Sequence, residues 1–277
     1  RAWFFFSLSM LYLGVLIAAS LLVLRMSVGT KGAEWTGFSL ASYAQLLEPY
    51  YLKSLLLTLR LALISAVIAV VLAIPVAYTM SRLTSPFVRR IFLAAVLLPL
   101  LVNLLLQSYG WLVILGPGGM LNQTLMGLGL IKRPIMLLYN QNGVLMGLVQ
   151  TAFPLAVLPI ASAMRGVARS YEEAAATLGA SRFQVFRQVV LPMSLPGIIT
   201  GATLVFAYNA SSFVVPLLLG GRRVPMLAVM VHDQIAPLMN WPAASAAGVV
   251  LIVTTLAIMT LSEYITGRRR RMLEASQ

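Results

Sequence analysis

Long apolar runs, separated by short polar segments or by glycine and proline, dominate the chain. A helix needs about 20 predominantly apolar residues to cross the hydrocarbon core of a bilayer. Six runs reach roughly that length, at residues 3–24, 54–80, 91–115, 143–164, 195–219 and 243–266. The pattern therefore predicts an all-α integral membrane protein with six transmembrane helices.

The composition agrees with a place in the bilayer. Of the 277 residues, 60% are hydrophobic and 10% are charged, and the mean hydropathy is +0.92, which is outside the range of ordinary soluble domains. The formal net charge of +13 is spread over short basic clusters between apolar runs, whereas a nucleic-acid-binding protein gathers its charge on one face. We therefore expect contact with membrane lipid and none with nucleic acid.

The few cysteine and histidine residues exclude several kinds of chemistry. The chain has no cysteine and one histidine, His232. It therefore offers no disulfide framework, no thiol nucleophile and no cluster of histidine and cysteine ligands for a metal. Since His232 falls in a predicted external loop, a membrane-embedded enzyme with a Ser/His/Asp set or an HExxH site is disfavoured.

The distribution of arginine and lysine predicts the orientation in the membrane, because cytoplasmic loops carry the excess of positive charge. One side holds Arg82, Arg89, Arg90, Arg165, Arg169, Arg182, Arg187 and Arg268 to Arg271. The opposite loops hold Arg25, Lys31, Lys53, Lys132, Arg133, Arg222 and Arg223, with Glu34 and Glu48 beside those of the first loop. We expect both termini in the cytoplasm.

Between the fourth and fifth runs, a charged segment predicts a short cytoplasmic helix. Ser170 precedes Glu173 by three positions, the spacing of a capping box at a helix start. The residues that follow place an apolar stripe on one face, and Gly179 stands where a left-handed residue would end the helix. The stripe consists of Tyr171, Ala174, Ala175 and Leu178.

A second helix is predicted directly afterwards. Ser181 and Gln184 repeat the capping-box spacing, and Pro192 and Pro196 stop or bend the helix. A plain connector is one interpretation of this segment. The other is a docking surface, since a loop between two spans needs only a handful of residues.

The same segment resembles a family signature. Glu173-Ala174-Ala175, Gly179, Val189 and Leu191-Pro192 reproduce the spacing of the EAA loop, which is found in permease subunits of binding-protein-dependent ABC importers; only Val189 departs, standing where isoleucine is usual. The resemblance implies a type I ABC importer permease fold, with a cytoplasmic coupling helix between the fourth and fifth spans. It also implies that residues 1–53 form a first helix and external loop, and residues 54–277 a core permease domain with its coupling loop at 165–194.

In that family the coupling helix inserts into a groove of an ATPase subunit. The resemblance implies that ATP and Mg are bound by this partner, and that the present chain is a translocation subunit without enzymatic activity or a cofactor of its own. It also implies ATPase-contacting residues, namely Tyr171, Glu172, Glu173, Ala174, Ala175, Leu178, Gly179 and Arg182.

Two further runs, at residues 109–148 and 215–231, are similar to the first permease of spermidine/putrescine systems. This similarity implies a polyamine importer of the bacterial cytoplasmic (inner) membrane. The expected partners are a second, homologous permease in a heterodimer, two cytoplasmic ATPase subunits and an extracytoplasmic substrate-binding protein.

Polar residues inside the predicted spans are candidates for a solute path, because such residues are costly in lipid and tend to face a cavity or another helix. We select Asn103, Gln107, Gln150, Tyr208, Asn209 and Ser212. The alternative is that these side chains only form hydrogen bonds between helices.

The solute stays open at this point. No aspartate or glutamate lies near the middle of any predicted span, although a path for dications is expected to hold acids. A sister importer for a phosphonate, an amino acid or another small charged solute is therefore the alternative. A secondary transporter driven by an ion gradient is less favoured, since it would also need buried acids or histidines.

Overall fold

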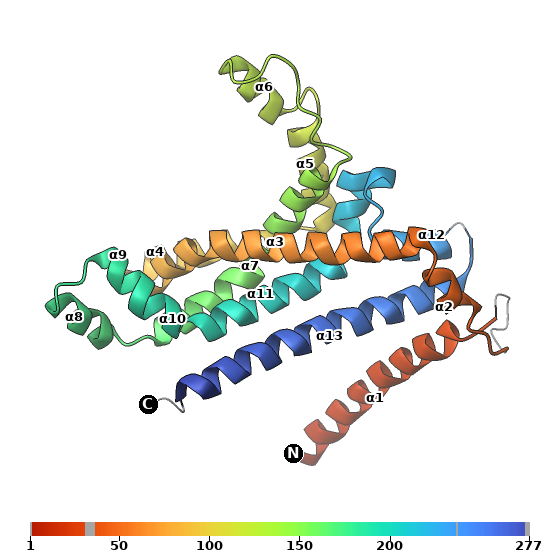
Figure 1. Ribbon diagram of the computed structural model, residues 1–277, viewed down its shortest axis with the longest axis horizontal. Helices are drawn as coiled ribbons and strands as arrows, with labels where there is room; N and C mark the ends of the chain where they lie inside the picture. The colour runs from red at the N-terminus through yellow and green to blue at the C-terminus, as the bar shows by residue number, and fades with distance from the viewer. Residues whose placement is uncertain (1, 31–36, 237, 275–277) are drawn as a thin grey trace. The chain divides into compact units, whose positions relative to one another are not determined.

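The computed structural model describes residues 2–30, 37–236 and 238–274. It is helical, and the chain divides into two compact units (Figure 1). Residues 1–57 and 226–277 form the first unit, and residues 58–225 form the second. Lys31 and Glu34, which entered the prediction of orientation, lie outside the described residues. The division at residue 53 predicted above stays a prediction.

The first unit contains α1 (Ala2–Ser27), α2 (Ala41–Leu46), the first turns of α3 (Pro49–Arg82), α12 (Leu227–Ile235) and α13 (Trp241–Glu274). Helices α1 and α13 run side by side (Figure 1). Buried residues of α2, α3, α12 and α13 form one hydrophobic core, made of Leu46, Tyr51, Leu227, Met230, Ala246, Ala247 and Leu251.

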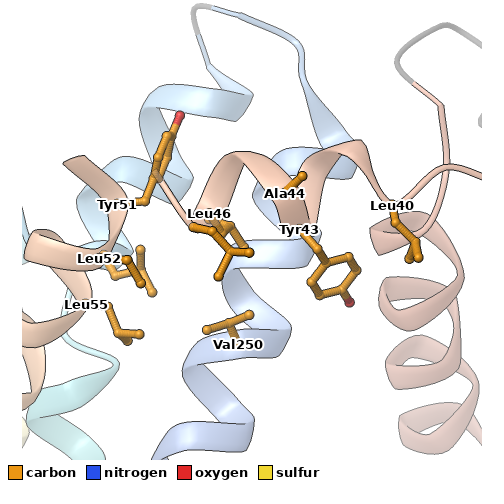
Figure 2. Close-up of a pocket in the computed structure, with 10 residues that line it drawn as sticks. Leu40, Tyr43, Ala44, Leu46, Tyr51, Leu52, Leu55 and Val250 are labelled. Carbon is orange, nitrogen blue, oxygen red and sulfur yellow. The ribbon is translucent and has the colours of Figure 1, made fainter. Parts of the chain in front are cut away.

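Hydrogen bonds tie the buried polar ends of this core together. The Tyr51 hydroxyl accepts from Nε2 of Gln45 at 3.0 Å and from Nε2 of Gln234 at 2.9 Å. Beside it lies a cavity of about 380 Å³, where Leu46 of α2 and Val250 of α13 point toward one another (Figure 2). Apolar side chains of α2 and α13 line this cavity, so it lies at the edge of the hydrophobic core of the first unit.

The second unit contains the rest of α3 and the helices that follow it. These are α4 (Pro86–Leu101), α5 (Leu104–Leu115), α6 (Met120–Gly127), α7 (Gln141–Gly166), α8 (Arg169–Thr177), α9 (Arg182–Val185), α10 (Leu191–Met193) and α11 (Leu195–Ala210), with π-helical turns η1 (Phe186–Val190) and η2 (Pro216–Gly220) and the 3₁₀ turn η3 (Gly221–Arg223).

Helices α7 and α11 form the centre of the second unit. They approach closely because small residues lie between them: a Cβ added at Gly197 would come within 2.6 Å of the Pro159 carbonyl oxygen, and one at Gly201 within 3.1 Å of the Ala156 carbonyl oxygen. Close contact through small residues is the usual way in which membrane helices associate. Val144, Leu148, Val157 and Ile160 of α7 are fully buried.

The predicted number of membrane spans is confirmed. Among the described residues, five helices are long and apolar enough to cross a membrane, and there are six crossings if the bent pair at 182–193 and 195–210 counts as one. The two parts of this pair meet at an angle of 66°, as the prolines at 192 and 196 predicted.

Two predicted spans differ from the structure. The third, predicted as one helix, is broken at residues 102–103 into α4 and α5. The fifth was predicted to reach residue 219, but α11 ends at Ala210 and the chain resumes in the π-helical turn η2. The first break lies in a run that is apolar apart from Asn103, so hydropathy does not reveal it, whereas the second follows the polar residues Tyr208, Asn209, Ser211 and Ser212.

Candidate functional site

Helix α8 starts earlier than its sequence indicated. Its N-cap is Ala168, without a side-chain capping bond, so the predicted capping box of Ser170 and Glu173 is wrong. The reason lies in the short connection from α7: residues 167 and 168 are both extended, and the helix resumes at once at Arg169. Ser170 therefore sits inside the first turn rather than before it.

The end of α8 agrees with the prediction. Gly179 has φ of +87°, a left-handed conformation that glycine adopts without the steric cost of a Cβ. The Gly179 amide donates to the Ala176 carbonyl at 3.0 Å, and the Ala180 amide donates to the Ala175 carbonyl at 3.1 Å. This pair of bonds is a Schellman motif, which fixes the direction in which the chain leaves the helix.

The helix that follows has the second predicted capping box. The Ser181 amide donates to Oε1 of Gln184 at 2.7 Å, and the Gln184 amide donates to Oγ of Ser181 at 3.4 Å. The cap holds α9 directly behind Gly179, so the loop between the two helices is short and defined.

Several large apolar side chains of this helical pair are exposed among the described residues. Leu178 is 89% exposed, Phe183 69% and Tyr171 55%. Glu173 and Arg182 are also exposed, which leaves charges beside the apolar side chains. Exposed apolar side chains with a charged surround are typical of a protein interaction site. We name the exposed residues Tyr171, Glu173, Leu178, Arg182 and Phe183 together the outer face, although Tyr171 and Glu173 lie on different sides of α8.

The inner face of α8 is held by α3. Glu172 forms an ion pair with Arg82, and Nη1 of Arg82 also donates to the Val167 carbonyl oxygen at 3.4 Å. Successive helix residues point about 100° apart, so Glu172 and Glu173 cannot face the same way. Contact of Glu172 with the ATPase stays a prediction. Its pairing with Arg82, which stands 90 positions earlier in the chain, was not predicted.

The six candidate path residues do not meet in one place. Asn103 is the N-cap of α5, where its side chain accepts from the Leu105 amide at 2.9 Å. Gln107 donates through Nε2 to the carbonyl oxygens of Pro99 and Val102. Both side chains therefore serve the break between α4 and α5.

The polar candidates at the end of α11 differ in their exposure. Asn209 is fully buried, and its Nδ2 donates to Oγ of Ser65 on α3 at 2.8 Å. Ser212 is buried as well, whereas Tyr208 is exposed. Asn209 thus has the interhelical role that was the alternative interpretation of these residues.

Gln150 is the candidate that faces open space. It lines a cavity of about 660 Å³ in the second unit, together with apolar and aromatic side chains of α3, α4, α5 and α7. Trp111 also lines the cavity, and its Nε1 donates to Oε1 of Gln150 at 3.3 Å. The remaining lining residues are Ile68, Leu72, Pro99, Leu137, Asn142, Leu145, Met146, Val149 and Phe153.

Comparison with known proteins places these features in a family. Residues 66–271 match the family described as the binding-protein-dependent transport system inner membrane component. The spermidine/putrescine transport system permease protein PotB of Haemophilus influenzae is 34% identical over 257 residues, covering 92% of this chain and 88% of that protein. PotB of Escherichia coli is 32% identical over 236 residues, covering 85% and 84%.

A relative named for a different solute matches less of the chain. PhnU of Salmonella typhimurium, a candidate 2-aminoethylphosphonate permease, is 30% identical over 156 residues, or 56% of this chain and 54% of that protein. Among solved structures, a bacterial alginate ABC transporter has a chain with a TM-score of 0.80 at 16% identity, covering 97% and 96%. At that identity the structural likeness concerns the fold, which is that of a type I ABC importer permease.

Proposed function

The chain belongs to the binding-protein-dependent transport system inner membrane components and is a permease of an ABC importer, and we propose that it forms half of a pathway for polyamines such as spermidine and putrescine. The observation that carries the proposal is similarity to PotB over 84–88% of the PotB chains. Similarity to PhnU extends over about half of each chain, which makes a phosphonate system the second candidate.

The cavity in the second unit suits weak contact with a polyamine. Aromatic rings attract cations through their faces, and Trp111 and Phe153 are part of the wall. Among the described residues, the lining includes no acid that would hold a dication tightly. In this proposal the binding protein selects the solute, and Gln150 with the aromatic wall lets it pass. Asn103, Gln107 and Asn209 act through the hydrogen bonds that they make; a role of Tyr208 and Ser212 in the path stays a prediction.

The outer face is the proposed contact with the ATPase. In our proposal Tyr171, Leu178 and Phe183 enter a groove of that subunit, with Glu173 and Arg182 at the rim. ATP and Mg would then be bound and used entirely by the partner, and this chain would need no cofactor. Ala174, Ala175 and Gly179 keep the helix narrow enough to fit.

The complete importer would contain this chain, a second homologous permease, two ATPase subunits and an extracytoplasmic binding protein. In this proposal both termini lie on the cytoplasmic side of the inner membrane, which the arginine-rich segments named above support. In that orientation α8 faces the ATPase and the loops holding Lys132 and Arg222 face the binding protein.

The proposal is tested by purifying the tagged permease in mild detergent and identifying its copurifying proteins by mass spectrometry. We expect an ATPase, a second permease and a binding protein. Uptake of labelled spermidine, putrescine and 2-aminoethylphosphonate into proteoliposomes of this complex then identifies the solute. Uptake of the phosphonate alone would overturn the polyamine proposal, and uptake by the isolated chain without ATP would overturn the whole assembly.

A matched pair of substitutions tests the outer face. Leu178→Asp places a charge in the apolar surface and should abolish copurification of the ATPase. Leu128→Asp alters another exposed leucine, directly after α6 and 68% exposed, and should leave copurification intact. Equal recovery of the ATPase with both variants would contradict the proposed contact.

A further inference from the structure

The cytoplasmic end of α3 contacts both halves of the coupling segment. Arg82, the last residue of α3, forms an ion pair with Glu172 of α8 and donates to the Val167 carbonyl just before that helix. One turn earlier, the ring of Tyr78 meets the ring of Phe186 edge to face, with centroids 5.0 Å apart. The segments before and after Gly179 are therefore attached to the same helix end (Figure 1).

These contacts have the geometry of a fixed joint rather than of a loose surface pair. The side chains of Arg82 and Glu172 are only 18% and 20% exposed, and the Arg82 guanidinium carbon lies 6.0 Å from the centre of the Tyr78 ring. A guanidinium held by a carboxylate, a backbone carbonyl and an aromatic face has little freedom to rotate. Exposed ion pairs lack this support and contribute little.

Few acidic residues are available to pair with Arg82, which makes its pairing with Glu172 specific. Between residues 58 and 225, Glu172 and Glu173 are the only acids in the sequence. Glu173 is exposed on the outer face, whereas Glu172 is turned inward to Arg82. The two adjacent acids thus have opposite tasks: one is available to another protein and the other is used within the chain.

We propose that Arg82 is a positioning residue that fastens the coupling helix to α3 through Glu172, so that displacement of α8 by the ATPase is carried directly into α3. This inference rests on the proposed function, because it needs the ATPase to move α8. Without the joint, the ATPase would still bind the outer face, but α8 would move without taking α3 with it.

The test compares uncoupling with loss of assembly in the purified importer complex. We would prepare Arg82→Gln, Glu172→Gln, the double variant and the exchanged pair Arg82→Glu with Glu172→Arg. Spermidine uptake and ATP hydrolysis are measured in the same proteoliposomes, with Arg90→Gln as a control that removes an exposed arginine near the start of α4.

Each single variant should keep the ATPase bound and lower the number of solute molecules carried per ATP by roughly three- to tenfold, as expected for contacting charged groups. The double variant should be no worse than either single one, and the exchanged pair should restore part of the coupling, because a glutamate at position 82 cannot donate to the Val167 carbonyl. A merely structural role would instead lower recovery of the ATPase and the rate of hydrolysis together with uptake. Additive losses, or no recovery in the exchanged pair, would overturn the joint.

A different result separates this inference from the proposed function. If no ATPase copurifies with the wild-type chain, the proposed assembly is wrong, and so is the proposed role of Arg82 and Glu172. If the wild type assembles and transports, while Arg82→Gln and Glu172→Gln keep the wild-type ratio of uptake to hydrolysis, only the joint is wrong. Glu173→Gln provides the contrast, since it should weaken recovery of the ATPase instead.

Discussion

At the scale of single residues, Gly179 shows how one backbone conformation can determine the shape of a docking surface. Its positive φ allows the two Schellman bonds that end α8 and direct the chain into α9. A side chain at this position has open space around it, so any cost of substitution arises from the backbone and not from collision with neighbours. The position is therefore a clean probe of the loop.

We predict that Gly179→Ala strains the cap by about 1–2 kcal/mol, the cost of a left-handed residue with a Cβ, and lowers transport. Uptake per ATPase bound measures the effect. Gly166→Ala at the end of α7 is the matched control, because that glycine also has open space but no positive φ. Normal transport with Gly179→Ala would show that the direction of the loop does not matter.

A second single-residue contact is the buried hydrogen bond between Asn209 and Ser65. It joins α11 to α3 over 144 positions of sequence. We predict that Asn209→Ala lowers the free energy of unfolding by about 1 kcal/mol, within the range measured for polar contacts between membrane helices. Thermal unfolding in detergent tests this, with the exposed neighbour Tyr208→Phe as the control. Equal unfolding temperatures for the two variants would argue against the bond.

At the scale of elements, the break between α4 and α5 is closed by side chains. The carbonyl groups near the end of α4 lose their helical partners, and an unpaired carbonyl is costly in lipid. Nε2 of Gln107 supplies a donor to two of them, at Pro99 and Val102. Asn103 performs the complementary task by accepting from the Leu105 amide in the first turn of α5.

Replacing Gln107 by Leu keeps the side chain apolar enough for the membrane but removes this donor. We predict a loss of stability of about 1–3 kcal/mol, the cost of leaving buried polar groups unpaired. The unfolding temperature in detergent is the measurement. An ionised glutamate in Gln107→Glu has no donor for the two carbonyls but keeps the size of the side chain, so this variant should also lower the stability of the protein. Unfolding temperatures equal to that of the wild type in both variants would contradict the role of Gln107 at the break.

Many of the helix ends were predictable from the sequence, because they depend on residues that are close together in the chain. Gly179 and the Ser181–Gln184 box depend on residues a few positions apart, and both were predicted correctly. The break at residue 102 was missed because Pro99 and Asn103 are compatible with a kinked span as well as with a broken one. Ser170 failed as a cap because a second start, at Ala168, competed with it.

At the scale of the whole molecule, the charge pattern and the helices together predict a topology that can be tested directly. The chain has no cysteine, so a single introduced thiol reports one position without background. Thr177 at the end of α8 and Lys132 in the loop after α6 are both exposed. The predicted orientation places them on opposite sides of the membrane.

We predict that Thr177→Cys reacts with a membrane-impermeant maleimide only when the cytoplasmic face is accessible, as in inside-out vesicles. Lys132→Cys should react only from the opposite side, in right-side-out vesicles. Labelling of both positions from the same side would contradict the six-crossing topology. Reversed labelling would keep the number of crossings and invert the orientation.

The contacts between distant segments were beyond prediction from one sequence. The attachment of Glu172 to Arg82 and the pairing of Asn209 with Ser65 depend on which helices become neighbours. The apolar periodicity says which residues avoid water, but in lipid both faces of a helix are apolar, so it does not identify the partner. The path residues were for this reason the least predictable part of the site.

The bond from Trp111 to Gln150 gives the protein an optical readout of its own. The indole lies in the cavity wall with its N–H engaged by an amide, and indole emission shifts with the polarity around the ring. A cation that enters the cavity changes that polarity. With the other three of the four tryptophans replaced by phenylalanine, the colour of the remaining fluorescence would follow the occupancy of the cavity during each transport cycle.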